Sequence, residues 1–166
     1  MLEQQPDYVT KEKRDIDDLA AIVKALRSPQ GCPWDRKQTH ASIERCMIEE
    51  AAESVDAIRL LAQKNNPDSL REELGDVLFQ VMMHSVMAEE EGYFTFSDVV
   101  DDISRKMIRR HPHVFGCYET DENGNPIRDW NEIKQREKHK STFSESKRHK
   151  RWRKKLVAIF CRLLSL

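Results

Sequence analysis

The chain has 166 residues, a length typical of one domain with a tail and sufficient to bury a hydrophobic core. Its hydrophobic fraction of 39% and charged fraction of 34% indicate a helical protein with wide solvated faces. The five glycines and three tyrosines are few for an all-β protein. No segment approaches the roughly 20 apolar residues of a membrane span, which argues against an integral membrane protein.

The net charge of −1 conceals an asymmetry along the chain. Eight of the 28 basic residues lie from Lys147 onward, where there is no acidic residue. The rest of the chain therefore carries 20 basic residues against all 29 acidic ones. An acidic body argues against general nucleic-acid binding. It does not argue against a nucleotide whose charge is carried by a metal ion.

The cysteines form no CxxC pair, so the sequence predicts neither a disulfide framework nor a zinc site. They are Cys32, Cys46, Cys117 and Cys161. Free thiols fit a reducing compartment, and the polar N-terminus does not resemble a signal peptide. We therefore expect a cytoplasmic protein.

Two helices are predicted before residue 64. Apolar residues from Ile16 to Leu26 recur at helical spacing and predict a helix over about 15–26. The segment Ser-Pro-Gln-Gly-Cys-Pro that follows Arg27 breaks the pattern. Thr39 is a suitable N-cap for a second helix that runs to about residue 63.

A third helix is predicted after the Asn-Asn-Pro turn at 65–67. Asp68 is a suitable cap, the apolar stripe continues to about residue 91, and Gly92 is well placed to end the helix. Because the turn is short, the second and third helices are expected to run antiparallel.

Shorter helical segments complete the pattern. Ser97 is a suitable cap for a fourth helix over about 98–110, which Pro112 ends. A loop is expected at 121–126 and a short helix at about 130–140. With no convincing strand, the predicted class is all-α, an antiparallel bundle of about four main helices.

Acidic residues gather on one face of the second helix and one face of the third. About 100° separates successive helical residues, so Glu49, Glu50 and Glu53 share an arc, and Glu73 and Asp76 share a face. Of these five, only Glu49 has a basic residue, Arg45, three or four positions away. Carboxylates that converge without basic partners suit a hard divalent cation such as Mg²⁺.

Two other interpretations of the acids compete with a magnesium site. Acidic runs commonly form a solvated surface, although surface helices usually mix charges of both signs. A di-iron bundle normally needs Glu-x-x-His pairs, and the sequence has none.

The cationic and aromatic candidates lie elsewhere. Lys106 and Arg110, four residues apart, suit phosphate oxygens but equally suit an ordinary basic helix end. Trp34 follows a Gly-Cys-Pro segment, and Trp130 and Lys134 are also four apart. Either indole can stack on a nucleotide base or fill a core.

In order and spacing, five segments resemble the MazG-type nucleoside triphosphate pyrophosphohydrolases, an all-α family. They are GCPWDRKQTH at 31–40, EEAAE at 49–53, EELGDVLFQV at 72–81, KMIRRHPHVFG at 106–116 and DWNEIKQREK at 129–138. The resemblance covers roughly residues 15–138, and we expect a family domain over 1–140.

The resemblance implies an activity: Mg²⁺-dependent hydrolysis of NTPs or dNTPs to the monophosphate and pyrophosphate, which limits unwanted or excess nucleotides. Water activated by the metal would attack the α-phosphorus, and Mn²⁺ is a candidate substitute for Mg²⁺. The family also implies a homodimer or a higher homo-oligomer that completes the bundle.

The resemblance further implies roles for individual residues. The metal ligands would be Glu50, Glu53, Glu73 and Asp76. Glu49 would be a further ligand or would orient water, so the catalytic candidates are Glu49, Glu50 and Glu53. The substrate-binding candidates are Lys106 and Arg110 for phosphates, with Trp130, Lys134 and Trp34 for the nucleotide.

The tail, 141–166, lies outside the resemblance. It is first basic and then apolar, which suits an anionic membrane surface, RNA or the acidic body itself. A disordered or aberrant C-terminus is at least an equal alternative. The rival functions are a non-catalytic helical scaffold recruited through this tail and a nucleotide sensor without turnover.

Overall fold

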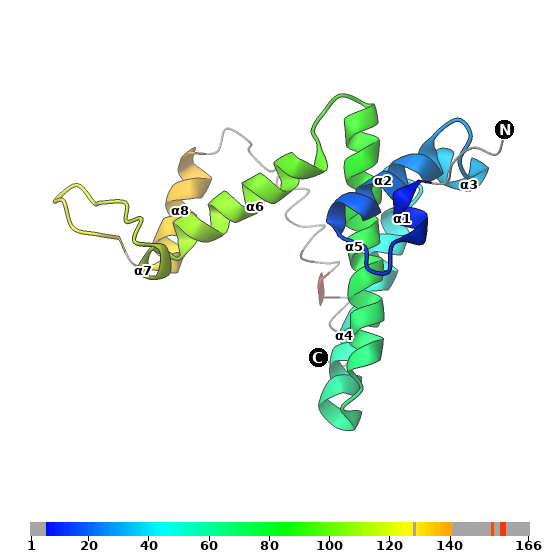
Figure 1. The fold of residues 1–166 in the computed structure, drawn as a ribbon. Helices are drawn as coiled ribbons and strands as arrows, with labels where there is room; N and C mark the ends of the chain where they lie inside the picture. The colour runs from blue at the N-terminus through cyan, green and yellow to red at the C-terminus, as the bar shows by residue number, and fades with distance from the viewer. Residues whose placement is uncertain (1–5, 128, 141–153, 155–156, 159–166) are drawn as a thin grey trace. The chain divides into compact units, whose positions relative to one another are not determined.

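The computed structural model describes residues 6–127, 129–140, 154, 157 and 158. The regular structure of these residues is helical (Figure 1). They contain no strand, only an isolated bridge between Thr120 and Pro126. The all-α prediction is therefore confirmed for this part of the chain. The chain divides into two compact units, Met1–Phe96 and Ser97–Leu166, which are described separately below.

The first unit is built on a helical hairpin. Its helices are α1 (Asp7–Thr10), α2 (Ile16–Arg27), α3 (Pro33–Arg36), α4 (Glu44–Lys64) and α5 (Pro67–Glu90). Helices α4 and α5 pack against each other, and α2 packs on α5 (Figure 1).

The turn between α4 and α5 explains the hairpin. Asn65 ends α4 in the left-handed region at φ 50°, which asparagine tolerates better than most residues. Pro67 then occupies the first turn of α5, where its missing N–H costs no helical hydrogen bond. The chain reverses over two residues, so the predicted antiparallel pair is confirmed.

Three predicted helix starts are wrong by a few residues. Thr39 Oγ1 accepts the Ser42 N–H at 3.2 Å, but this caps a separate turn and α4 begins only at Glu44. Asn66, not Asp68, caps α5. Ser97 lies inside the first turn of α6, which begins at Phe96. The N-cap of α4 is Ile43, which makes no side-chain hydrogen bond, so that boundary carries no polar capping signal.

The core of the first unit joins α2, the entry to α4 and the second half of α5. Its buried side chains are Val23, Ile43, Met82, Met83, Val86 and Met87. Toward the turn between α4 and α5, by contrast, several apolar side chains of the two helices remain exposed. Ile58 is 52% exposed, Leu74 53% and Leu78 38%.

The second unit contains α6 (Phe96–Arg110), α7 (Pro112–Phe115) and α8 (Trp130–Lys140). The end of α6 before Pro112 and the helix from Trp130 were both predicted. The loop at 121–126 is also confirmed, since the Asp121 carboxylate accepts the backbone N–H groups of Asn123 and Asn125.

Several predictions lie beyond this description. No helix among the described residues is long and apolar enough to cross a membrane. The predictions about the tail, 141–166, fall almost entirely outside the described residues. Three expectations stay predictions: the four-helix bundle, the domain boundary at residue 140 and the completion of the bundle by dimerisation.

A histidine pair ties the segment before α4 to α5. The Nδ1 atoms of His40 and His84 lie 2.7 Å apart, and the rings stack with centroids 5.0 Å apart. This hydrogen bond needs a proton on one Nδ1 and a lone pair on the other, so the pair cannot be doubly protonated. Burial, followed by the proximity of His40, lowers the pKa of His84.

The pair makes stability depend on pH. The pKa of His84 is lower in the folded chain than its ordinary 6.5, so the unfolded chain binds more protons as pH falls. The pair therefore contributes stability at pH 7.5 that is lost toward pH 5.5. We expect the double variant His40→Phe/His84→Phe to lack this contribution, so that its free energy of unfolding falls less, or rises more, than that of the wild type over this range. Urea unfolding at both pH values measures this.

His113→Phe is the matched control for the histidine pair, because His113 is exposed and lies outside the pair. It should keep the wild-type dependence of stability on pH. An equal dependence in the double variant and the wild type would show that the pair does not cause it.

Candidate functional site

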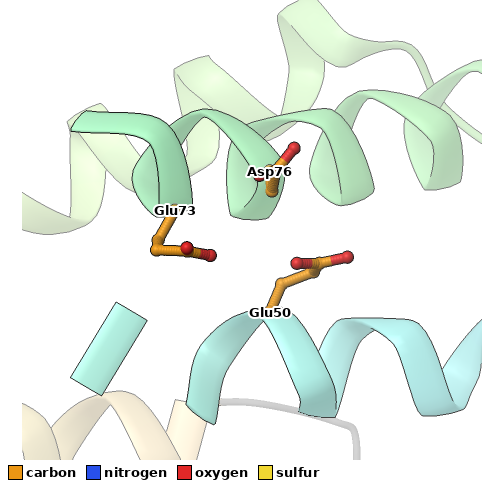
Figure 2. A group of neighbouring side chains, drawn as sticks. All are labelled: Glu50, Glu73 and Asp76. Carbon is orange, nitrogen blue, oxygen red and sulfur yellow. The ribbon is translucent and has the colours of Figure 1, made fainter. Parts of the chain in front are cut away.

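Three carboxylates meet across the α4–α5 hairpin. Glu50 projects from α4 toward Glu73 and Asp76, which lie one turn apart on α5 (Figure 2). Each offers one oxygen, and these oxygens all lie within 4.8 Å of one another. We call Glu50, Glu73 and Asp76 the acid cluster. Its three members were all predicted, and the hairpin brings them together as expected.

The acid cluster is electrostatically unfavourable by itself. Burial, then the charges of Asp76 and Glu53, raise the pKa of Glu50. Burial, then Glu53 and Asp76, raise the pKa of Glu73. Both carboxylates therefore resist ionisation, which is expected of acids that repel one another without a cation.

One oxygen of the acid cluster and one oxygen beside it are buried without a hydrogen-bond partner among the described residues. They are Glu73 Oε2 and Gln80 Oε1. The Gln80 side chain lowers the pKa of Glu50, so it lies near the same group. Unsatisfied oxygen acceptors next to three carboxylates fit a hard divalent cation, which takes oxygen ligands.

The other two predicted acids differ from the cluster. Glu53 lies one turn after Glu50 and is exposed; its charge reaches Glu50 and Glu73, but it is not among the three converging oxygens. Glu49 accepts from Arg45 Nε at 2.6 Å, the pair expected from the sequence. The structure thus brings together three of the five acids and leaves two beside them.

The second unit gathers cations around Trp130. The Lys134 ammonium lies 4.4 Å from the Trp130 ring centroid, and the Arg110 guanidinium carbon lies 5.5 Å from it. Both distances fit cation–π interactions. Three of the predicted substrate-binding residues are therefore neighbours.

Glu137 is part of the same group and was missed by the sequence analysis. It accepts from Arg109 Nε at 2.7 Å and from Arg110 Nε at 3.0 Å. Burial raises its pKa, but the two guanidiniums outweigh burial and hold the pKa of Glu137 below its usual value. We call Arg109, Arg110, Trp130, Lys134 and Glu137 the cation–aromatic cluster.

Helical spacing could have identified Glu137. Trp130, Lys134 and Glu137 stand at positions 0, 4 and 7 of α8, which share one helix face. An acid at the third of these positions is the expected partner for the basic residues at the end of α6.

The two remaining substrate candidates lie in different units. Lys106 is half-buried on α6, one turn before Arg110. Trp34 belongs to α3 and is 63% exposed, which favours a surface role over core packing.

Comparison with known proteins gives an independent line of evidence. The model of the MazG nucleotide pyrophosphohydrolase domain matches residues 38–115, which contain the acid cluster. The chain is 47% identical over 129 residues to the nucleoside triphosphate pyrophosphohydrolase/pyrophosphatase MazG of Thermotoga maritima, covering 78% of this chain and 48% of that protein.

Two further relatives are similar over most of the chain. The nucleoside triphosphate pyrophosphohydrolase of Escherichia coli K12 is 44% identical over 124 residues, covering 74% of this chain and 46% of the relative. The uncharacterized protein YabN of Bacillus subtilis is 47% identical over 130 residues, covering 78% and 26%. The chain therefore spans about half or less of the length of these relatives.

The family model, these relatives and the all-α hairpin agree with one another. The motif segments at 49–53 and 72–81 supply the acid cluster, and both lie within the matched residues. The chain therefore carries a domain of the MazG nucleotide pyrophosphohydrolase family.

Proposed function

We propose that the protein hydrolyses nucleoside triphosphates, ribo or deoxyribo, to the monophosphate and pyrophosphate. The proposed role is to limit unwanted or excess nucleotides. The observation that carries the proposal is the acid cluster inside a MazG domain. The names of the relatives from Thermotoga maritima and Escherichia coli support the same reaction.

Glu50, Glu73 and Asp76 are proposed to hold Mg²⁺, or Mn²⁺ in its place, with Glu53 as a further ligand. The unsatisfied Glu73 Oε2 supports this assignment. A bound ion of this kind shields phosphate charge and lowers the pKa of a bound water. Glu49, next to Glu50, is proposed to orient the attacking water or to add a ligand.

Cationic and aromatic side chains are proposed to bind the nucleotide. Lys106 and Arg110 bind phosphate oxygens, since both are cations on consecutive turns of α6. Trp130 and Lys134 complete the nucleotide site, and the exposed ring of Trp34 offers a second stacking surface. Phosphate and metal contacts are shared by all NTPs, so these residues select no particular base.

Homodimerisation or higher assembly is proposed to cover the exposed part of the hairpin. Leu74 follows Glu73 directly, Leu78 is two residues after Asp76, and Ile58 lies on α4. All three are more than a third exposed. A second copy that buries them would remove water from the neighbourhood of the acids and strengthen their interaction with a cation.

The reaction itself can be tested with Glu50→Gln, which keeps the size of the side chain and removes its charge. We expect the wild type to release pyrophosphate and NMP only with Mg²⁺ or Mn²⁺. We expect kcat/KM to fall at least about 100-fold in Glu50→Gln, because a metal ligand supplies several kcal/mol of charge stabilisation. Glu53→Ala tests the fourth ligand in the same assay and should also lose activity.

Glu72→Gln is the matched control, since Glu72 is exposed and lies beside the acid cluster without belonging to it. It should keep near-wild-type turnover. Binding of NTP without release of pyrophosphate would instead identify a nucleotide sensor, and intact NTP with no binding would favour the scaffold.

The cost of the uncompensated acids can be measured without substrate. Because the pKa of Glu73 is raised, its charge destabilises the metal-free fold at pH 7. Glu73→Gln should therefore have a higher Tm than the wild type in chelator. Mg²⁺ should then stabilise the wild type and leave Glu73→Gln unchanged.

The control for this thermal experiment is again Glu72→Gln, which should respond to Mg²⁺ as the wild type does. A lower Tm for Glu73→Gln in chelator would contradict the electrostatic account of the acid cluster.

A further inference from the structure

We propose that Glu137 is a positioning residue for phosphate binding: it fixes the Arg110 guanidinium beside the Trp130 ring with one edge left for a phosphate. The proposal rests on the proposed function, because it assigns Arg110 to the triphosphate of the substrate. The proposal adds Glu137 to the site. Arg109 holds the Glu137 carboxylate in place through its own hydrogen bond.

The two oxygens of Glu137 are divided between two arginines. Oε1 accepts from Arg109 Nε at 2.7 Å and is 2.6 Å from Arg109 Nη2. Oε2 accepts from Arg110 Nε at 3.0 Å and also from Arg110 Nη2. One carboxylate thus joins the last turn of α6 to α8, and each oxygen is committed to one guanidinium.

This arrangement uses only one edge of Arg110. A guanidinium has five N–H donors in a fixed plane. Glu137 occupies the edge formed by Nε and Nη2. Within the described residues Arg110 Nη1 has no hydrogen-bond partner, so the Nη1–Nη2 edge remains for two parallel bonds to a phosphate.

Trp130 restricts the remaining freedom of the guanidinium. The carbon at the centre of the guanidinium lies 5.5 Å from the ring centroid, within cation–π range. A contact with the ring and a hydrogen-bonded edge together limit rotation about the last bonds of the Arg110 side chain. Such preorganisation lowers the entropy lost when a phosphate binds.

Burial and charge distinguish this group from an ordinary surface ion pair. The side chains of Arg110 and Glu137 are 16% and 18% exposed. The cluster holds three cations, Arg109, Arg110 and Lys134, against the single carboxylate of Glu137. Two positive charges therefore remain unbalanced within the cluster, a surplus that suits a polyphosphate.

Calorimetric binding of inorganic triphosphate to the full chain, with Mg²⁺ present, tests the proposal directly. Glu137→Gln should weaken binding about tenfold, equivalent to about 1.4 kcal/mol or one charge-assisted hydrogen bond. With NTP as substrate, KM should rise by a similar factor while kcat changes little. Glu132→Gln is the matched control, since Glu132 pairs with Arg136 on the same helix and should leave both values unchanged.

A double-mutant cycle separates positioning from a general structural effect. If Glu137 acts through Arg110, Glu137→Gln should weaken triphosphate binding little further in an Arg110→Lys background. Additive losses would overturn the proposal. If thermal unfolding shows that Glu137→Gln is poorly folded, Glu137→Asp replaces it. Glu137→Asp keeps the charge and withdraws the oxygens by one methylene, so its affinity should also fall.

The binding experiment gives an answer whether or not turnover occurs. If the wild type binds inorganic triphosphate but releases no pyrophosphate from NTP, the proposed function is wrong. The affinities of the wild type and Glu137→Gln for triphosphate still test the positioning role in that case. Wild-type affinity in Glu137→Gln, or no binding of triphosphate by the wild type, would overturn the positioning role.

Discussion

Repulsion among the carboxylates of the acid cluster is the constraint on which the rest of the account depends. The Asn65–Asn66 turn and the packing of α4 on α5 force Glu50 toward Glu73 and Asp76. Burial then raises the pKa of two of them, so the folded chain holds charge that it does not neutralise itself. A divalent cation relieves this repulsion, which is why a feature that destabilises the metal-free fold is useful in a metal site.

The two units carry opposite and complementary excesses of charge. The first unit holds uncompensated oxygens in the acid cluster. The second holds more cations than carboxylates in the cation–aromatic cluster. A Mg²⁺–triphosphate needs carboxylates for its metal and arginine and lysine for its remaining phosphate charge, so each cluster taken by itself suits one part of the proposed substrate.

The sequence predicted which residues lie near the site better than it predicted where the helices begin. Acid spacing on two helices joined by a short turn predicted that the two acidic faces could meet, because helix geometry fixes which residues share a face, and three of the five acids do converge. The predicted caps failed because the helices do not all begin at a capping side chain: α4 begins after Ile43, which caps nothing, and α5 is capped by Asn66, two residues before Asp68. Helical spacing could have placed Glu137 on the face of Trp130 and Lys134, but it could not show the contacts with two arginines that lie 27 and 28 residues away.

The most direct test of the central claim is to locate the ion. Crystals of the full chain grown with Mn²⁺ would show anomalous scattering wherever the ion binds. We expect an anomalous peak among the carboxylates of Glu50, Glu73 and Asp76, and we expect Glu73→Gln to lose it. A peak elsewhere in the protein, or an acid cluster that stays free of Mn²⁺ at saturating concentration, would contradict it.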